Sequence, residues 1–332
     1  MKPAVREQEW MLDKGILAVD NFRMSLLVQA MTPRSDVFIQ SGAVRLAVQD
    51  YGGSGSLVLL LHGAGRSAAD WLPMTRQLTS NRHVVALDLR GHGLSESGEW
   101  TADTVLEDIQ TVLQTYSSAD VSILGHSLGG VLAFLYARKY GGIRRIVDLD
   151  GFALCASEYV GMSAAQAMTS EARARAGWLR PQAALTGQAV AALERNCREA
   201  SGLSQADGSE IIARMLVPLG DDRYSLRTDT QAILGIRDLY DGFLAGRSFF
   251  DLVRAMETPS LIFRAGRLDL PPKIPEWYKD MLQAYHLGVQ KQTDALQESS
   301  QFMLSVRESS HMMMLEEPDA LAAEIHRFLD AG

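Results

Sequence analysis

The sequence is short of several features that define whole classes of protein. Only two cysteines, Cys155 and Cys197, occur in 332 residues, too few for a disulfide framework or a cysteine metal cluster, so we expect a reduced, cytoplasmic setting. No uninterrupted run of about 18 apolar residues is present, so we expect no transmembrane helix. The 32 basic residues are outnumbered by 40 acidic ones and form no evident patch, so we expect no nucleic-acid partner.

The first 36 residues are expected to form a helical extension that precedes the main domain. Apolar residues recur there at near-helical spacing, at Ile16, Val19, Phe22, Leu26 and Leu27. Polar residues interrupt this stretch between positions 20 and 23, which is not typical of a secretory signal. We expect the helix to pack on the body of the protein or on a second subunit of a homodimer, with docking on a membrane surface as a third alternative.

From residue 37 to residue 151, short apolar runs alternate with amphipathic runs. The apolar runs predict strands at 37–39, 44–48, 57–61, 83–87, 121–124 and 143–149. The amphipathic runs predict helices at 71–78, 105–116 and 128–140. Such alternation is typical of an α/β fold with right-handed crossovers and a mostly parallel sheet.

The alternation breaks at about residue 152. Residues 152–256 are rich in Ala, Met, Gln and Arg and contain no convincing apolar strand, so we expect a helical insertion there. Strand-like runs return at 260–263 and 302–306, and a final helix begins after Pro318. The prediction is a core made of residues 37–151 and 257–332, with residues 152–256 inserted between them.

The segment Gly125-His126-Ser127-Leu128-Gly129-Gly130 lies between a predicted strand and a predicted helix. A serine on such a tight turn projects from the carboxyl edge of a sheet, where it can act as a nucleophile. Small residues are needed at 125 and 129, because side chains there would collide with neighbouring backbone. The bare Gly-x-Ser-x-Gly pattern also arises by chance, so the strand before it and the helix after it carry this interpretation.

A second glycine-containing segment, His62-Gly63-Ala64-Gly65, follows the predicted strand at 57–61. An enzyme that transfers acyl groups needs hydrogen-bond donors, fixed in advance, for the negatively charged oxygen of its intermediate. The backbone amide of Leu128 is one candidate donor, and the amide of Ala64, or alternatively that of Gly65, is the other. The alternative interpretation is that this segment merely turns a corner.

These segments, together with Asp88-Leu89-Arg90-Gly91-His92-Gly93-Leu94-Ser95, resemble the α/β-hydrolase superfamily from about residue 37 onward, apart from the insertion. The resemblance implies an α/β-hydrolase fold, with a mostly parallel sheet of about eight strands and helices on both faces. It also implies that residues 152–256 form a helical cap over the carboxyl edge of the sheet, where the cap shapes a substrate pocket.

The resemblance further implies a catalytic triad that runs nucleophile, acid and base along the chain. His311 lies after the last predicted strand and before the final helix, where the family has its catalytic histidine. The family's usual acid position, in the loop after the strand at 260–263, is occupied here by Asp269. Asp150, at the end of the preceding strand, is the alternative acid; we favour Asp269.

The residues and the resemblance together predict a serine hydrolase that cleaves an ester, thioester or related acyl bond through an acyl-enzyme intermediate, with no cofactor and no metal. The expected partner is a medium-sized, largely apolar acyl substrate. Gly63, His126 and Trp71 are candidates for its pocket, although core packing is the alternative for Trp71, and an elbow neighbour such as His126 normally points away. An acyltransferase or cyclase, a carbon–carbon bond hydrolase, and a ligand receptor with little turnover stay open as alternatives.

Overall fold

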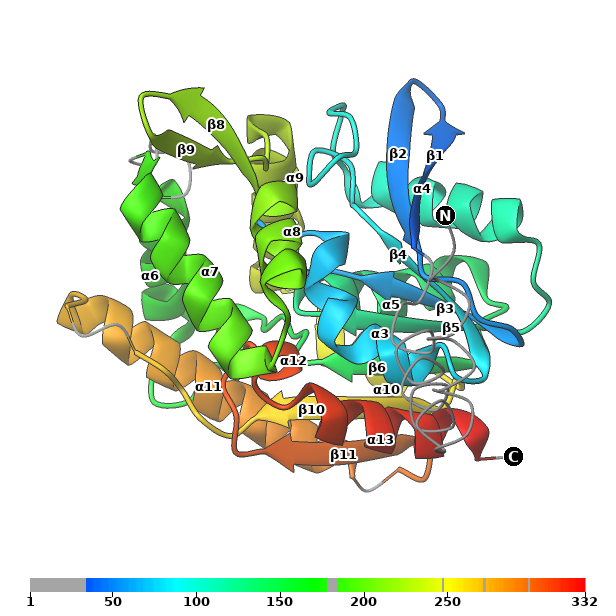
Figure 1. Cartoon of the computed structure of the whole chain (residues 1–332). Helices are drawn as coiled ribbons and strands as arrows, with labels where there is room; N and C mark the ends of the chain where they lie inside the picture. Colours follow the sequence, from blue (N-terminus) through cyan, green and yellow to red (C-terminus); the bar gives the residue numbers. More distant parts are fainter. Residues whose placement is uncertain (1–33, 178–183, 247, 271–272, 298, 332) are drawn as a thin grey trace, which may run out of the picture.

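The computed structural model describes residues 34–177, 184–246, 248–270, 273–297 and 299–331. Within these ranges one sheet has the strand order β1-β2-β4-β3-β5-β6-β10-β11 (Figure 1). Its strands are β1 Ser35–Ser41, β2 Val44–Asp50, β3 Ser56–Leu61, β4 Arg82–Leu87, β5 Val121–His126, β6 Arg145–Leu149, β10 Ser260–Ala265 and β11 Phe302–Arg307. The β1–β2 and β2–β4 pairs are antiparallel and the others are parallel, which confirms the predicted mostly parallel sheet of about eight strands.

The central strands read as unbroken apolar runs because they are covered on both faces. In β3 every residue from Leu57 to Leu61 is at most 1% exposed. Leu57, Leu59 and Leu61 belong to one hydrophobic cluster, whereas Val58 and Leu60 belong to another. The strand therefore separates two apolar layers, as a parallel sheet between helices requires.

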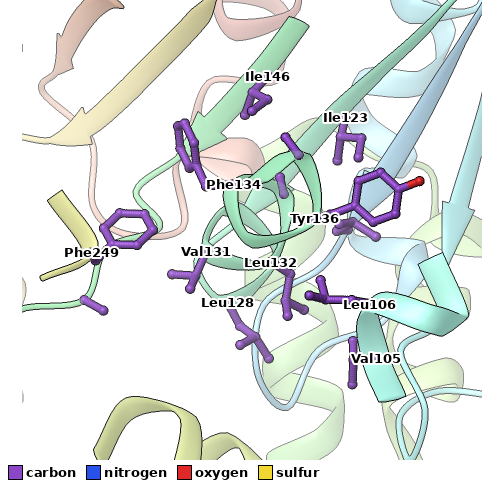
Figure 2. Packing of buried hydrophobic residues seen from close by; sticks show 14 of the residues in the cluster. Val105, Leu106, Ile123, Leu128, Val131, Leu132, Phe134, Tyr136, Ile146 and Phe249 are labelled. Carbon is purple, nitrogen blue, oxygen red and sulfur yellow. The ribbon is translucent and has the colours of Figure 1, made fainter. Parts of the chain in front are cut away.

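Helices cover the two faces of the sheet. One layer contains α4 (Ala102–Tyr116), α5 (Leu128–Tyr140), α10 (Phe249–Arg254) and α11 (Glu276–Leu296). The other contains η1 (Ala68–Trp71), α3 (Leu72–Leu78), α12 (Met313–Glu316) and α13 (Pro318–Asp330). Figure 2 shows α5 between the strands that carry Ile123 and Ile146 and the helix that carries Val105 and Leu106. The packing of α5 matters for the site, because this helix begins directly after Ser127.

The segment between β6 and β10 is the expected insertion, but it is not purely helical. Its elements are η2 Ala156–Glu158, α6 Ala164–Ala176, β7 Leu185–Thr186, α7 Gly187–Ser201, α8 Gln205–Met215, β8 Leu216–Gly220, β9 Arg223–Leu226, α9 Thr230–Leu244 and α10. β7, β9 and β8 form a small antiparallel sheet, which the expected helical insertion did not include. These strands are short and poorly buried, and Leu219 is 53% exposed. The sequence therefore contains no buried apolar run that would predict them.

A buried ion pair ties this insertion to the core. The Arg214 guanidinium of α8, only 4% exposed, donates through Nε to Asp88 Oδ2 at 2.8 Å and through Nη1 to Asp36 Oδ1 at 2.7 Å. Asp88 follows β4, and its carboxylate also accepts from the backbone amides of Ala68 and Leu94, both at 2.7 Å. One carboxylate therefore joins three segments of the core to the insertion.

The helical extension expected at residues 1–36 lies almost wholly outside the described residues, and residues 35 and 36 belong to β1. Among the described helices, none combines the length and the apolar character needed to cross a membrane.

Candidate active site

Ser127 lies on the turn between β5 and α5 in a strained backbone conformation. Its φ is 53° and its ψ is −118°, in a region that non-glycine residues rarely adopt. The turn is held by the hydrogen bond from the Ser127 amide to the Leu149 carbonyl at 3.0 Å, and by that from the Gly130 amide to the Ser127 carbonyl at 2.9 Å. This geometry matches the nucleophile elbow that the sequence predicted.

The glycines around Ser127 are required by close backbone contacts. A Cβ on Gly125 would lie 2.2 Å from the carbonyl group of Gly129, and one on Gly129 would lie 2.1 Å from the Leu61 carbonyl oxygen. A Cβ on Gly130 would lie 1.9 Å from Asp148 Oδ1. The expectation that positions 125 and 129 need small residues is confirmed.

His311 and Asp150 form a hydrogen-bonded pair beside this turn. His311 lies in the loop between β11 and α12, and its Nδ1 is 2.7 Å from Asp150 Oδ2. The imidazole is 50% exposed, whereas the Asp150 side chain is 14% exposed. With Nδ1 donating to the carboxylate, Nε2 is left to act as an acceptor.

Asp269, which we favoured as the acid, does not meet His311. Its carboxylate pairs with Arg267 at 2.8 Å and is 57% exposed at the surface. Arg267 also pairs with Glu316 at 3.1 Å. The contacts therefore favour Asp150 over Asp269 as the partner of His311, because Arg267, two residues earlier, pairs with the Asp269 carboxylate.

Asp150 is fixed by the backbone of the neighbouring strand β10. Its own amide donates to the Phe263 carbonyl at 2.9 Å, and its Oδ1 accepts from the Ala265 amide at 2.9 Å. Burial acts to raise the pKa of Asp150, but the hydrogen bond and charge of His311 and the Ala265 amide outweigh it, so the pKa lies below its ordinary value. Asp150 thus remains a carboxylate facing the imidazole.

His126 supports the loop that carries His311. Its Nε2 donates to the His311 carbonyl at 2.8 Å, and the two rings lie 4.7 Å apart between centroids. Burial, together with the nearby His311, lowers the pKa of His126 to about 3, so the ring is neutral. Two serines hold the same loop: Ser309 donates to Glu317 at 2.7 Å, and Ser310 donates to Glu316.

Two of the three residues proposed for the substrate pocket do not reach it. His126 is 1% exposed, and Trp71 is fully buried in the core cluster that contains α3 and α13. Their contacts explain why they lie outside the cavity, since His126 binds the His311 backbone and the Trp71 ring packs in the apolar layer on one face of the sheet. Gly63 is buried too, but it lies against Ser127, because a Cβ built on it would come within 3.2 Å of Ser127 Cβ.

The loop that contains Gly63 forms a tight turn next to Ser127. The Arg66 amide donates to the Gly63 carbonyl at 3.2 Å, and Gly65 has a φ of 72°, which suits the third residue of a type II turn. The amides of the two central residues, Ala64 and Gly65, donate no hydrogen bond within the described ranges. The Leu128 amide, at the first position of α5, has no partner inside its own helix. These amides lie in the residue after Ser127 and in the turn that begins at Gly63, whose position is next to Ser127.

Ser127, Asp150 and His311 line one cavity of about 550 Å³. This volume lies within the usual range for small-molecule sites, about 300–1,000 Å³. Its walls include Phe152, Tyr240, Leu282, Tyr285, Val289 and Met312, with Arg264, Arg267 and His286 adding polar groups. The sequence did not identify the residues from α9 and α11; the region between Asp269 and Phe302 carried only a weak helical pattern.

No metal centre accompanies these residues in the described ranges, where no group of three or more His, Cys, Asp or Glu side chains could hold an ion. The arrangement offers instead a serine at a helix N-terminus, an imidazole oriented by a carboxylate, and free backbone amides. These are the parts that nucleophilic catalysis on an acyl group uses.

Relatives share parts of the sequence. Mouse protein phosphatase methylesterase 1 is 35% identical over 102 residues, which are 28% of this chain and 26% of that protein. The 2-(acetamidomethylene)succinate hydrolase of Mesorhizobium japonicum is 33% identical over 149 residues, 43% of this chain and 51% of the relative. The chain thus spans about half or less of the length of these curated relatives.

Solved structures share the fold over most of the chain. E-2-(acetamidomethylene)succinate hydrolase superposes with a TM-score of 0.65 at 21% identity and covers 90% of this chain and 100% of that one. The thioesterase domain from the curacin biosynthetic pathway gives 0.65 at 22% identity, with 89% and 99% covered. A sequence model of the alpha/beta hydrolase family matches residues 58–324, most of the chain, and the chain therefore belongs to the alpha/beta hydrolase family.

Proposed function

We propose that the protein is a serine hydrolase that cleaves an ester, thioester or related acyl bond through a triad of Ser127, His311 and Asp150. The observation that carries this proposal is the 2.7 Å hydrogen bond between His311 Nδ1 and Asp150 Oδ2, made at the wall of the cavity that Ser127 also lines. Similarity to a methylesterase and to a succinate-derivative hydrolase supports acyl chemistry. A serine in place of a carboxylate nucleophile argues against haloalkane or epoxide chemistry on this fold.

In the first step, the Ser127 hydroxyl attacks the acyl carbon while His311 Nε2 takes its proton. Asp150 holds the imidazole in the required tautomer and stabilises the positive charge that it gains. The carbonyl oxygen becomes an oxyanion, and the amides of Leu128 and Ala64 are the donors we assign to it, with Gly65 as the neighbouring alternative. Collapse of this intermediate expels the alcohol or thiol, which receives the proton from His311, and leaves the acyl-enzyme.

In the second step, water adds to the acyl-enzyme. His311 takes a proton from the water, a second oxyanion forms at the same donors, and its collapse releases the acid and restores the Ser127 hydroxyl. The half-exposed imidazole favours this hydrolytic outcome over transfer to another acceptor, because solvent reaches His311 directly. Acyl transfer or carbon–carbon bond hydrolysis on the same triad, and a receptor role with little turnover, are the competing functions.

The substrate we propose is a medium-sized acyl compound with a largely apolar body. A cavity of about 550 Å³ with Phe152, Leu282 and Val289 in its walls supports this size and character. Residues 152–256 act in this proposal as a cap, since Phe152 and Tyr240 come from that segment and line the cavity.

Labelling with a fluorophosphonate probe tests the nucleophile. The probe should modify Ser127 as mapped by mass spectrometry, and Ser127→Ala should lose both the label and the hydrolysis of p-nitrophenyl esters. Ser54→Ala, in an exposed loop, is the matched control and should keep both. Turnover that survives in Ser127→Ala would reject the triad, and a folded protein that neither labels nor turns over would favour the receptor function.

A further inference from the structure

A second cavity lies directly beyond the first. It has a volume of about 190 Å³ and shares Tyr240, Leu282 and Tyr285 with the cavity that contains Ser127. These three side chains therefore form the partition between the catalytic cavity and this back chamber. The remaining walls of the back chamber come from residues 154–159, α6 and α11, on the insertion side of the site.

Tyrosine rings dominate the walls of the back chamber. Tyr159, Tyr240, Tyr278 and Tyr285 all line it, and the rings of Tyr159 and Tyr285 meet at 5.8 Å with an interplanar angle of 60°. Apolar side chains fill the spaces between them, at Leu154, Ala174, Met281 and Leu282. Such walls favour an aromatic guest, because aromatic rings gain from edge-to-face and offset contacts beyond the burial of their area.

The volume of the back chamber fits one ring. At about 190 Å³ the back chamber, which is partly open to solvent, has room for a phenyl group and a small substituent. The catalytic cavity, at about 550 Å³, holds the reacting acyl group and the chain that leads to the partition.

The charged groups of the back chamber already have partners. The Tyr159 hydroxyl donates to Glu171 at 2.5 Å, and Arg175 Nε donates to the same carboxylate at 3.1 Å. Arg175 Nη1 also pairs with Asp241. The charges of these groups balance, because Arg175 lies between Glu171 and Asp241, and Asp241 is also 3.9 Å from Arg237. Arg175 therefore already has two carboxylate partners. A ligand carboxylate placed here would find no unpaired cation among the lining residues and would lose its hydration without compensation.

We propose that the back chamber is a specificity pocket for a neutral aryl group, joined by a short chain to the acyl carbon that Ser127 attacks. The proposal rests on the proposed function, because it names the substrate class of the same site. It predicts arylalkanoyl esters as preferred substrates and esters with a carboxylate on the ring as poor ones.

Two series of p-nitrophenyl esters test the proposal. One carries phenylacetyl, 3-phenylpropanoyl and 4-phenylbutanoyl groups, and the other carries straight-chain acyl groups of matched length. The best aryl ester should exceed its straight-chain counterpart roughly tenfold or more in kcat/KM, the discrimination that a hydrophobic pocket can supply. A 4-carboxyl group on the ring should remove that advantage.

Filling the back chamber should abolish the aryl preference without touching the triad. Ala174 lines the back chamber but not the catalytic cavity, so Ala174→Phe should lower kcat/KM for the aryl ester roughly tenfold and leave p-nitrophenyl acetate turnover unchanged. Ala174→Leu should give a smaller loss. Ala176→Phe, on the exposed side of the same helix, is the matched control and should change neither rate.

Failure of the specificity pocket and failure of the proposed serine hydrolase function give different results in these assays. Ser127-dependent turnover of the acetate ester without any aryl preference, or an aryl preference that survives in Ala174→Phe, overturns the specificity pocket and keeps the serine hydrolase. Acetate turnover that survives in Ser127→Ala overturns the proposed function itself.

Discussion

Replacing Asp150 with asparagine tests the identity of the acid most directly. In the wild type, Asp150 Oδ1 accepts from the Ala265 amide at 2.9 Å, and Oδ2 accepts from His311 Nδ1 at 2.7 Å. Asparagine has the same shape but only one accepting oxygen. If that oxygen keeps the bond to the backbone amide, the NH₂ group faces His311 Nδ1, and the imidazole proton moves to Nε2. The ring then cannot accept the serine proton.

The expected loss follows from this exchange of tautomer. The same replacement in a serine protease lowers kcat about 10⁴-fold while leaving the geometry intact. Asp150→Asn should therefore lower kcat by about 10³–10⁴-fold, which corresponds to about 4–5.4 kcal/mol of activation free energy at about 1.36 kcal/mol per tenfold. The half-exposed position of His311 favours the smaller loss of kcat within this range, because water can compete for the hydrogen bond at Nδ1.

Asp269→Asn is the control that separates the two candidate acids. Asp269 is 57% exposed and bonds only Arg267 among the described residues, so its replacement should change kcat by no more than about twofold. Initial rates on p-nitrophenyl acetate, with thermal melts to verify folding, give the comparison. A loss below about tenfold in Asp150→Asn, or a larger loss in Asp269→Asn than in Asp150→Asn, would refute the reasoning.

Three further predictions concern stability. Asp148→Asn should raise the melting temperature at pH 7 but not at pH 4. Burial and then the nearby Asp150 raise the pKa of Asp148 in the folded protein, so the wild type loses stability as the pH rises above the unfolded-state pKa of about 3.9. An equal change in melting temperature at both pH values would contradict this. Gly129→Ala should lower the free energy of unfolding in urea by about 3 kcal/mol or more, because its Cβ would lie 2.1 Å from the Leu61 carbonyl oxygen. Gly142 has a positive φ but nothing within 4 Å of an added Cβ, so Gly142→Ala should lower it by only about 1–2 kcal/mol. Equal losses would show that the backbone clash is not the cause. Arg214→Ala should cost about 3–5 kcal/mol because it leaves Asp88 buried without its partner, and adding Asp88→Asn should restore part of the loss.

The sheet could be predicted from the sequence because its central strands obey a strong physical rule. A strand covered on both faces must be apolar at every position, and residues 57–61 satisfy this without exception. The nucleophile turn was predictable for a related reason. At Gly125 and Gly129 any Cβ would collide with the backbone, so this turn requires glycine at both positions and the glycines are visible in the sequence.

The small sheet of the insertion carried no such signal. Only one residue of β8 and β9 is fully buried, and β7 has only two residues, so neither an apolar run nor a clear alternation was available. The back chamber was equally hidden. Its tyrosines come from positions 159, 240, 278 and 285, and only the tertiary fold brings these distant positions together.

The choice of acid depended on a property that spacing does not encode. Asp150 and Asp269 both follow strands that end at the same edge of the sheet, so both could have approached His311. The loops decided the outcome. Asp150 has a φ of 57° and accepts from the backbone of the adjacent strand, which directs its free oxygen toward the imidazole. Asp269 instead pairs with Arg267, two residues earlier in its own loop.

Two aspartates at the end of β6, Asp148 and Asp150, have pKa values that are shifted in opposite directions. Asp148 is fully buried with a single hydrogen bond, from the Gly151 amide at 2.9 Å, and its pKa is raised well above the ordinary value by burial and by the nearby Asp150. Asp150 is held by His311 and by the Ala265 amide, and its pKa is lowered. Environments that push neighbouring groups in opposite directions assign their protonation states. Asp150 therefore keeps its negative charge against the imidazole, whereas burial disfavours the charged form of Asp148, whose Oδ1 lies close to Gly130 of the serine turn.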